Sequence, residues 1–316
     1  MRLFEFLLKL NGKFSTIRKI TQPLVKKAVL DPTQRKRLNK FYHKLTYYEK
    51  SIFHALYGRI FRDGKNYDIQ GEWILKFAGK EIRIPLESES LWLDWETALS
   101  VLGHDYEIKA FYENQINSSN PPACFMDIGA NYGTHSLLLL SAGIHTFSIE
   151  PNPECKSYFE RLASYNQVKG EWFGLALGEG EGKAHIEFPE GETWLGTLSE
   201  TDFSNRKEAI KSYPVEIKTL DGLIVENGIK PDLIKIDTEG FEEGVIRGGE
   251  NYIKDKLPNV IFEANKGEEQ VRLQRTLHKI GLEIFSLKTY KKITCPEDIQ
   301  IKEGNFIASK EETLSF

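Results

Sequence analysis

The chain has 316 residues, of which 40% are hydrophobic and 28% charged, so it can bury a sizeable core. Its three cysteines, Cys124, Cys155 and Cys295, are far apart, which excludes a disulfide framework and a cysteine zinc site. The net charge of −4 conceals an uneven distribution: residues 1–65 hold 16 basic and 4 acidic side chains, whereas the remainder is acidic.

Residues 1–65 predict a basic helical subdomain, because apolar residues recur every three or four positions with Lys and Arg between them. Pro23 and the DPTQ stretch mark breaks between helices. Besides packing as a subdomain, this segment could lie on an anionic membrane or lipid-linked glycan, or bind nucleic acid. We expect packing first and peripheral membrane contact second. We do not expect nucleic acid, because the acidic remainder would repel a phosphate backbone.

No stretch of the sequence has the length and apolarity of a membrane span. The opening run MRLFEFLLKL is interrupted by Glu5 and Lys9, and no small-residue cleavage site comes after it, which argues against a secretory signal. The cysteine usage fits a reducing compartment. We therefore expect a cytoplasmic protein, with membrane association as an alternative.

The next segment, residues 66–122, predicts a hairpin and two helices. EWILKFAGKEIRIPL alternates with the period of a strand, and Ala78 and Gly79 supply its turn. LWLDWETALSVL and HDYEIKAFYENQI are helical, and NSSNPP is a loop. We group these elements with the remaining C-terminal residues, so that the expected domains are residues 1–65 and residues 66–316, the latter with its core at 123–316.

From Ala123 the pattern alternates between strands and helices, which predicts an α/β fold with a mostly parallel, doubly wound sheet. In the first helix after HTFSIE, Asn152 is placed as N-cap and Pro153 at the first helical position. The expected strands are ACFMDI, HTFSIE, EWFGLAL, KAHIEF, YPVEIKTL, DLIKID, NVIFEA and LEIFSL. One expected helix begins near Gly133. The other expected helices span NPECKSYFERLASYN, EEGVIRGGENYIK and EEQVRLQRTLHKI.

The loop after the first of these strands indicates the ligand. A dinucleotide fingerprint has the pattern G-x-G-x-x-G, but Asn131 stands where its second glycine would be. The acid Asp127 before the loop would repel a phosphate and favour an ammonium group. Glu150, at the end of the next strand, is placed to accept hydrogen bonds from both hydroxyls of a ribose. These features favour S-adenosylmethionine over NAD, the alternative being that both acids only cap helices.

Five stretches in order, FMDIGANYGTHSLLLL, SIEPNPE, ALGEGEGKAHIEF, VEIKTLDGLI and PDLIKIDTEGFEEGVIRGG, resemble the FkbM-type methyltransferases. The resemblance covers about residues 100–290, and D-x-E-G-x-E from Asp237 is its most specific piece. It implies a Rossmann-like class I methyltransferase fold and S-adenosylmethionine-dependent O-methylation of a sugar, glycan or other hydroxyl. The expected cofactor residues are Asp127, Gly129, Ala130, Asn131, Gly133, Thr134, Glu150, Pro151, Asn152 and Ala176.

The acids after DLIKI are the candidates for catalysis. Asp237 and Glu239 would share a face of an extended backbone, close to the methyl group. We expect Asp237 to be the general base or to orient the substrate, with Glu239 second; Glu239 could instead cap the next helix. These acids could also hold a divalent metal together with Glu263, which we do not favour.

Four residues are candidates for contact with the substrate: His104, Glu107, Trp194 and Glu263. The resemblance implies that the helix bearing Glu107 folds over the cofactor. His104 is the runner-up for the base, and we expect a solvated helix histidine ahead of that role. Trp194, in a long loop that also contains Thr197, could close on the substrate or only pack that loop. Other functions left open are methylation of a non-carbohydrate small molecule or lipid, a non-catalytic cofactor-binding module, and an NAD-dependent oxidoreductase. The sequence does not indicate the oligomeric state.

Overall fold

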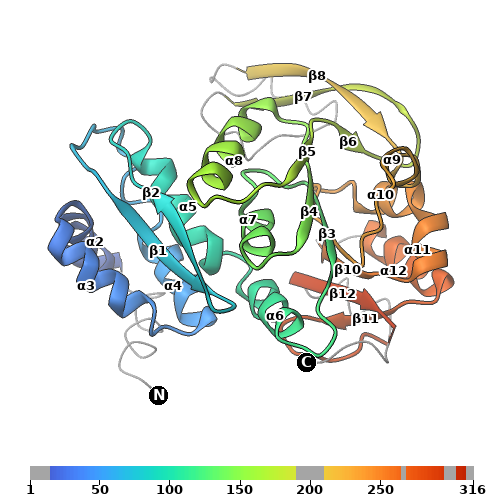
Figure 1. The fold of residues 1–316 in the computed structure, drawn as a ribbon, viewed down its shortest axis with the longest axis horizontal. Coiled ribbons are helices and arrows are strands. Elements are labelled where there is room, and N and C mark those ends of the chain that lie inside the picture. The colour runs from blue at the N-terminus through green and yellow to red at the C-terminus, as the bar shows by residue number, and fades with distance from the viewer. Residues whose placement is uncertain (1–14, 190–209, 265–267, 295–303, 311–316) are drawn as a thin grey trace. The chain divides into compact units, whose positions relative to one another are not determined.

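The computed structural model describes residues 15–189, 210–264, 268–294 and 304–310. The chain divides into two compact units (Figure 1). One comprises Met1–Glu113 with Tyr165–Gln167, and the other comprises Asn114–Ser164 with Val168–Phe316. The boundary expected at residue 65 therefore lies inside the first unit. Within the part of the chain described, no helix is both long and apolar enough to cross a membrane.

The first unit packs helices and a hairpin around aromatic side chains. Trp73 of the hairpin makes edge contacts with Tyr42 and with Trp95, and the Trp95 indole N–H donates to Tyr57 O at 2.7 Å. The hairpin turns at Ala78 and Gly79, both with positive φ, as predicted. Its elements are α2 (Ser15–Leu30), α3 (Pro32–Tyr42), α4 (Tyr47–Tyr57), β1 (Glu72–Phe77), β2 (Lys80–Pro85), α5 (Leu91–Gly103) and the beginning of α6 (Tyr106–Ile116).

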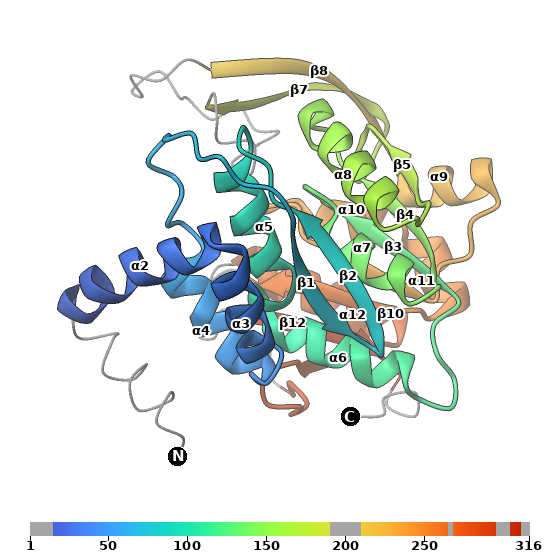
Figure 2. The same cartoon turned by 60° about the vertical axis from the view of Figure 1, so that its left-hand side comes forward.

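The second unit is built on a seven-stranded sheet in the order β11-β12-β10-β9-β3-β4-β5 (Figures 1 and 2). Strands β10, β9, β3, β4 and β5 are parallel, and β12 is antiparallel to both of its neighbours. This confirms the expected α/β fold with a mostly parallel sheet. The strands are β3 (Cys124–Ile128), β4 (His145–Ile149), β5 (Glu171–Phe173), β9 (Leu233–Ile236), β10 (Asn259–Ala264), β11 (Glu283–Ser286) and β12 (Gly304–Ser309).

The chain moves outward from β3 in both directions along this sheet, so right-handed crossovers place helices on its two faces. One group of helices follows β3 and β4, and the other precedes β9 or connects β9, β10 and β11. The helices are α7 (Thr134–Ser141), α8 (Pro153–Tyr165), α9 (Leu220–Asn227), α10 (Glu242–Gly248), α11 (Glu250–Lys256) and α12 (Glu268–Ile280). Ile234 and Ile236 of β9 are fully buried between these layers, which explains why its sequence is an almost unbroken apolar run.

A second sheet has the order β6-β8-β7, with bounds β6 (Ala176–Leu177), β7 (Gly182–Pro189) and β8 (Ile210–Lys218). The strand predicted over EWFGLAL is therefore wrong in its extent, because the chain leaves the main sheet after Phe173 and pairs with β8 from Ala176.

The single helix predicted over EEGVIRGGENYIK is also wrong, because it breaks at Gly248 and Gly249 into α10 and α11. A Cβ atom on Gly248 would lie 2.1 Å from Gly178 O, so the two segments approach closely only because this residue has no side chain.

Candidate active site

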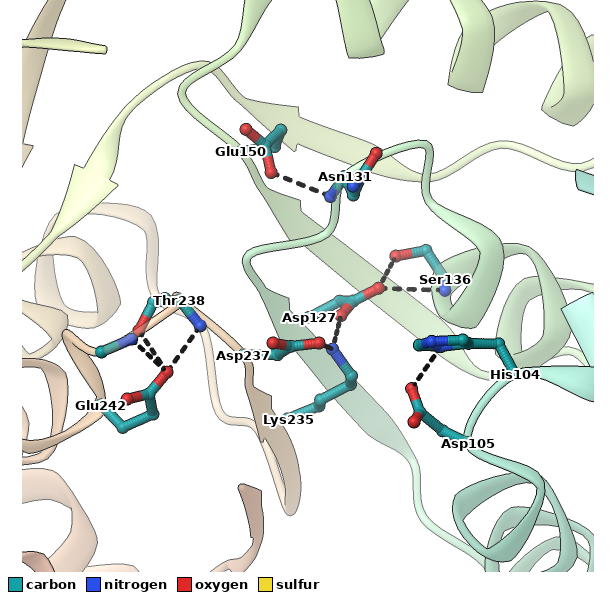
Figure 3. Close-up of polar contacts among 11 residues, drawn as sticks. His104, Asp105, Asp127, Asn131, Ser136, Glu150, Lys235, Asp237, Thr238 and Glu242 are labelled. Carbon is teal, nitrogen blue, oxygen red and sulfur yellow. Dashed lines mark hydrogen bonds and ion pairs between the residues drawn. The ribbon is translucent and has the colours of Figure 1, made fainter. Parts of the chain in front are cut away.

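Three acids lie at the carboxyl ends of three neighbouring strands (Figure 3). Asp127 is in β3, Glu150 follows β4 and Asp237 follows β9. Since β4, β3 and β9 are adjacent and parallel, their carboxyl ends share one edge of the sheet. The chain moves outward from β3 in both directions here, and such a switch point is where open α/β sheets bind ligands.

The glycine loop after β3 packs closely against the ends of the neighbouring strands and against α8. The backbone N–H groups of Gly129 and Ala130 donate to Ile149 O at 2.9 and 3.0 Å. Gly129 has φ 75°, and a Cβ atom there would lie 1.7 Å from Asp237 O. Gly133 has φ 70°, and its Cβ would lie 2.2 Å from the Phe159 ring. The glycines therefore let the loop approach β9 and α8, a requirement of the fold that exists before any ligand binds.

Asp127 is fully buried and organises this loop. Its Oδ2 accepts hydrogen bonds from the backbone N–H of Ser136 at 3.1 Å and from the Ser136 hydroxyl at 2.7 Å. Its Oδ1 lies 3.8 Å from Lys235 Nζ. Ser148 extends the network by donating to Ser136 Oγ at 2.8 Å. Because its carboxylate faces these groups, Asp127 fixes the start of α7 and lies beneath the loop.

Lys235 is a buried cation that the sequence motifs did not single out. It pairs in register with Asp127 across β3 and β9, and its side chain is only 4% exposed. Its Nζ lies 2.9 Å from Asp237 Oδ2 (Figure 3). A buried cation needs paired anions, so Lys235 joins two of the three acids into one electrostatic unit. The signal in the sequence was a lysine in an otherwise apolar strand.

Glu150 holds its carboxylate between two backbone donors. Its Oε2 accepts from Asn131 N at 2.9 Å, and its Oε1 accepts from Asn152 N at 2.9 Å. Burial raises the pKa of Glu150 to about 7, the nearby charges of Asp127 and Asp237 add to this, and the two N–H groups oppose it. Asn152 also accepts from Glu154 N at 3.0 Å, which confirms it as the N-cap of α8.

Glu242 organises the loop after β9. Its Oε1 accepts hydrogen bonds from Thr238 N at 2.9 Å, from Thr238 Oγ1 at 3.1 Å and from Gly240 N at 3.2 Å. Its side chain is buried, whereas Glu239 is exposed with the left-handed φ of 54°. The last acid of D-x-E-G-x-E therefore fixes the loop, a role that the spacing alone did not reveal.

A hollow opens above these groups, with about 740 Å³ of open space when its mouth is included. Seven of the predicted residues line it: Gly129, Asn131, Glu150, Pro151, Ala176, Asp237 and Glu239. Leu175, Leu177 and Ile186 add an apolar wall. In the part of the chain that the structure describes, no Lys, Arg or His side chain lines it.

The remaining predicted residues lie elsewhere. Five of them lie around the hollow without lining it: Asp127 in β3, and Ala130, Gly133, Thr134 and Asn152 in the loops and at the helix starts. Glu263 lies in β10. His104 and Glu107 belong to the first unit, where His104 Nδ1 lies 2.9 Å from Asp105 Oδ2. Trp194 and Thr197 fall outside the described residues. Those residues contain no group of three His, Cys, Asp or Glu side chains arranged to hold a metal ion.

Comparison with known proteins places this site in a family. The profile of the methyltransferase FkbM domain matches residues 127–291, which is just over half of the chain. Hexuronic acid methyltransferase AglP from Haloferax volcanii is 29% identical over 168 residues. That alignment covers 51% of this chain and 64% of the relative, so the chain spans less than two thirds of the relative's length.

Among solved structures, a methyltransferase FkbM from Methylobacillus flagellatus KT has a TM-score of 0.38 and 15% identity, covering 68% of this chain and 54% of that one. Fibrillarin from Aeropyrum pernix, solved with bound S-adenosyl-L-methionine, has a TM-score of 0.39 and 11% identity, covering 75% and 82%. The family match begins at Asp127 and runs through Glu150, Asp237 and Glu242, so it contains every acid of the site described above. The chain therefore belongs to the FkbM methyltransferase domain family.

Proposed function

We propose that the chain is an S-adenosylmethionine-dependent O-methyltransferase that methylates a hydroxyl group of a sugar or glycan. The observation that carries this proposal is the charge of the hollow: three carboxylates line it, and none of its described lining residues is basic. Such a site favours a ligand with a positive charge and no phosphates. Family membership supports the reaction, and the name of the Haloferax relative supports a sugar as the acceptor.

The residues of the hollow fit the proposed cofactor. The Glu150 carboxylate would accept hydrogen bonds from the two ribose hydroxyls, and Leu175, Ala176 and Leu177 offer an apolar surface for the adenine. Asp237 supplies a negative charge for the amino group or sulfonium end. When bound, the cofactor supplies a methyl group already activated on a sulfonium. Asp127 would act indirectly, by holding the loop that carries Asn131.

The remaining chemistry is alignment of the acceptor and removal of its proton. Asp237 is our first candidate, because its Oδ2 is held by Lys235 and its side chain remains 29% exposed toward the hollow. A carboxylate is a much weaker base than an alkoxide, so it can take the proton only as the methyl group is transferred. Glu239 is the second candidate, since it lines the same hollow on an exposed, left-handed turn.

Partners and location stay proposals as well. We propose a cytoplasmic location, with a peripheral membrane contact through the basic helices. We also propose that residues 1–65 help to recognise the natural acceptor. His104, Glu107, Trp194 and Glu263 remain proposed substrate contacts. The alternative of a divalent metal held by Asp237, Glu239 and Glu263 has no support, because these acids do not form a group arranged to hold a metal ion.

Isothermal titration with S-adenosylhomocysteine and with NAD tests the cofactor. We expect micromolar binding of the first and none of the second, and the reverse result would refute the proposal. Transfer of a labelled methyl group to a panel of neutral sugars, hexuronates and lipid-linked glycans then tests the acceptor. If the protein binds the cofactor and methylates a non-carbohydrate hydroxyl but none of these acceptors, the proposed methyltransferase activity stands. The proposed sugar acceptor is then refuted.

A further inference from the structure

Three polar side chains along one stripe of helix α2 bond to the rest of the first unit. Arg18 donates to Ala55 O at 3.3 Å, Gln22 donates to Leu56 O at 2.7 Å, and Lys26 bonds to Asp63 Oδ2 at 2.6 Å. Residues four apart lie along one face of a helix, so these three form a single stripe. Two of them satisfy carbonyl groups in the last turn of α4, which have no partner within that helix and favour cationic or N–H donors.

The opposite face of α2 is apolar and exposed. Ile20 and Leu24 follow Arg18 and Gln22 by two residues, about 200° around the helix. Their exposed fractions are 62% and 63%, among the highest of the large hydrophobic side chains that the structure describes. The inner side of α2 already buries Val29, so Ile20 and Leu24 are not needed for packing within the unit. Exposed aliphatic side chains gain nothing in water, so this face is suited to an apolar partner.

The exposed charged side chains of α2 and α3 are all basic. Between residues 18 and 42 there are six exposed basic side chains and no exposed acidic one: Arg18, Lys19, Lys27, Lys36, Arg37 and Lys40. Lys27 is three residues beyond Leu24, on the same side of the helix. Long lysine side chains can keep their ammonium group at an interface while the neighbouring apolar residues are buried.

We infer that α2 lies on an anionic lipid bilayer, with Ile20 and Leu24 inserted at the interface and the surrounding lysines facing lipid head groups. The basic side chains match an anionic surface, and the two aliphatic side chains match its apolar interior. A free anionic glycan offers negative charge but no apolar interior for the two aliphatic side chains. A single-stranded nucleic acid is bound through aromatic stacking and not through aliphatic residues. This inference does not depend on the proposed catalytic activity.

The test is co-sedimentation of the full-length protein with phosphatidylcholine vesicles, with and without phosphatidylserine, at low and high salt. We expect binding only to vesicles that contain phosphatidylserine, and release at high salt as the charges are screened. Ile20→Ser combined with Leu24→Ser should weaken binding roughly tenfold or more. Lys19→Gln and Lys27→Gln should each weaken it about fivefold.

Val225→Ser is the matched control, because Val225 is an exposed aliphatic residue of α9, 81% exposed, in the second unit. It should bind vesicles as the parent does. Thermal unfolding should be unchanged for all exposed-residue variants, which separates lost binding from lost folding. Failure of the parent to bind, or equal binding by the Ile20/Leu24 double variant, would overturn the inference. A parent dimer that the double variant dissociates, without vesicle binding, would assign the face to a second copy of the chain and would also overturn it.

Discussion

The raised pKa of Glu150 predicts that cofactor binding depends on pH. An ionised carboxylate can accept hydrogen bonds at both oxygens, whereas a protonated one must donate from one of them. With a pKa of about 7 in the free protein, only about a tenth of Glu150 is ionised at pH 6. The apparent dissociation constant rises in inverse proportion to this fraction. We expect binding about tenfold weaker at pH 6 than at pH 8, and about a hundredfold weaker at pH 5.

Glu150 should also make stability depend on pH, but stability should decrease as pH rises, whereas ligand binding strengthens. Its pKa in the folded protein, about 7, is above the ordinary value of 4.5, so the folded state holds this proton more tightly than the unfolded state does. The contribution of Glu150 to the free energy of unfolding therefore falls as pH rises from about 4.5 to about 7. Its size is about 3 kcal/mol, from 1.36 kcal/mol for each pKa unit. Ligand binding should thus strengthen over the interval in which this contribution to stability declines.

The assay is isothermal titration with 5′-methylthioadenosine, which has the adenine and the ribose but no amino group to titrate in this range. Glu150→Gln keeps the shape and removes the charge. It should bind roughly tenfold to a hundredfold more weakly at pH 8 and show no pH dependence between 6 and 8. Glu160→Gln, on an exposed position of α8, is the matched control and should behave like the parent. An unchanged slope in Glu150→Gln would refute the ribose assignment.

Three substitutions test the rest of the site. Asp237→Asn should retain binding of S-adenosylhomocysteine and lower turnover by about 10²–10⁴-fold; turnover within a few-fold of the parent would remove it from the base role. Lys235→Met should lower the free energy of unfolding in urea by about 3–5 kcal/mol, because it leaves the buried Asp127 without its cation; no change in the urea midpoint would contradict this. Gly129→Ala should unfold at lower urea and lose cofactor binding, since its Cβ would overlap Asp237 O; parent-like titration and unfolding curves would show that the loop can move aside.

Much of the core could be predicted because local and global signals agree there. The buried strands β3 and β9 are mostly apolar runs bounded by Gly, Pro or acids, and Asn152 with Pro153 marks the start of α8. Strand β12 was missed because its position depends on pairing with β10 and β11, which no periodicity within its own six residues specifies. The split of EWFGLAL between two sheets is likewise a tertiary effect, since both halves look like strands.

The sequence predicted where the site residues lie better than it predicted what each of them does. The sequence placed Glu150 and Asp237 at strand ends, and both line the hollow. Motif order cannot show which way a side chain points, so Asp127 was expected to face the ligand although its carboxylate faces Ser136 and Lys235. The supporting role of Glu242 could not be predicted either, because it consists of hydrogen bonds to a loop whose backbone conformation the residue types do not specify.

The place of β12 in the sheet has a consequence for biosynthesis. This strand follows β11 in the chain yet lies between β10 and β11, and residues Asn305–Ser309 are buried. During translation, the sheet cannot be completed until Ser309 has left the ribosome. Before that, β10 has one edge without its native partner, and β11 has no native neighbour in the sheet at all. Unpaired apolar edges are templates for aggregation, so a nascent chain that stalls between β11 and β12 exposes strand edges that the completed sheet covers.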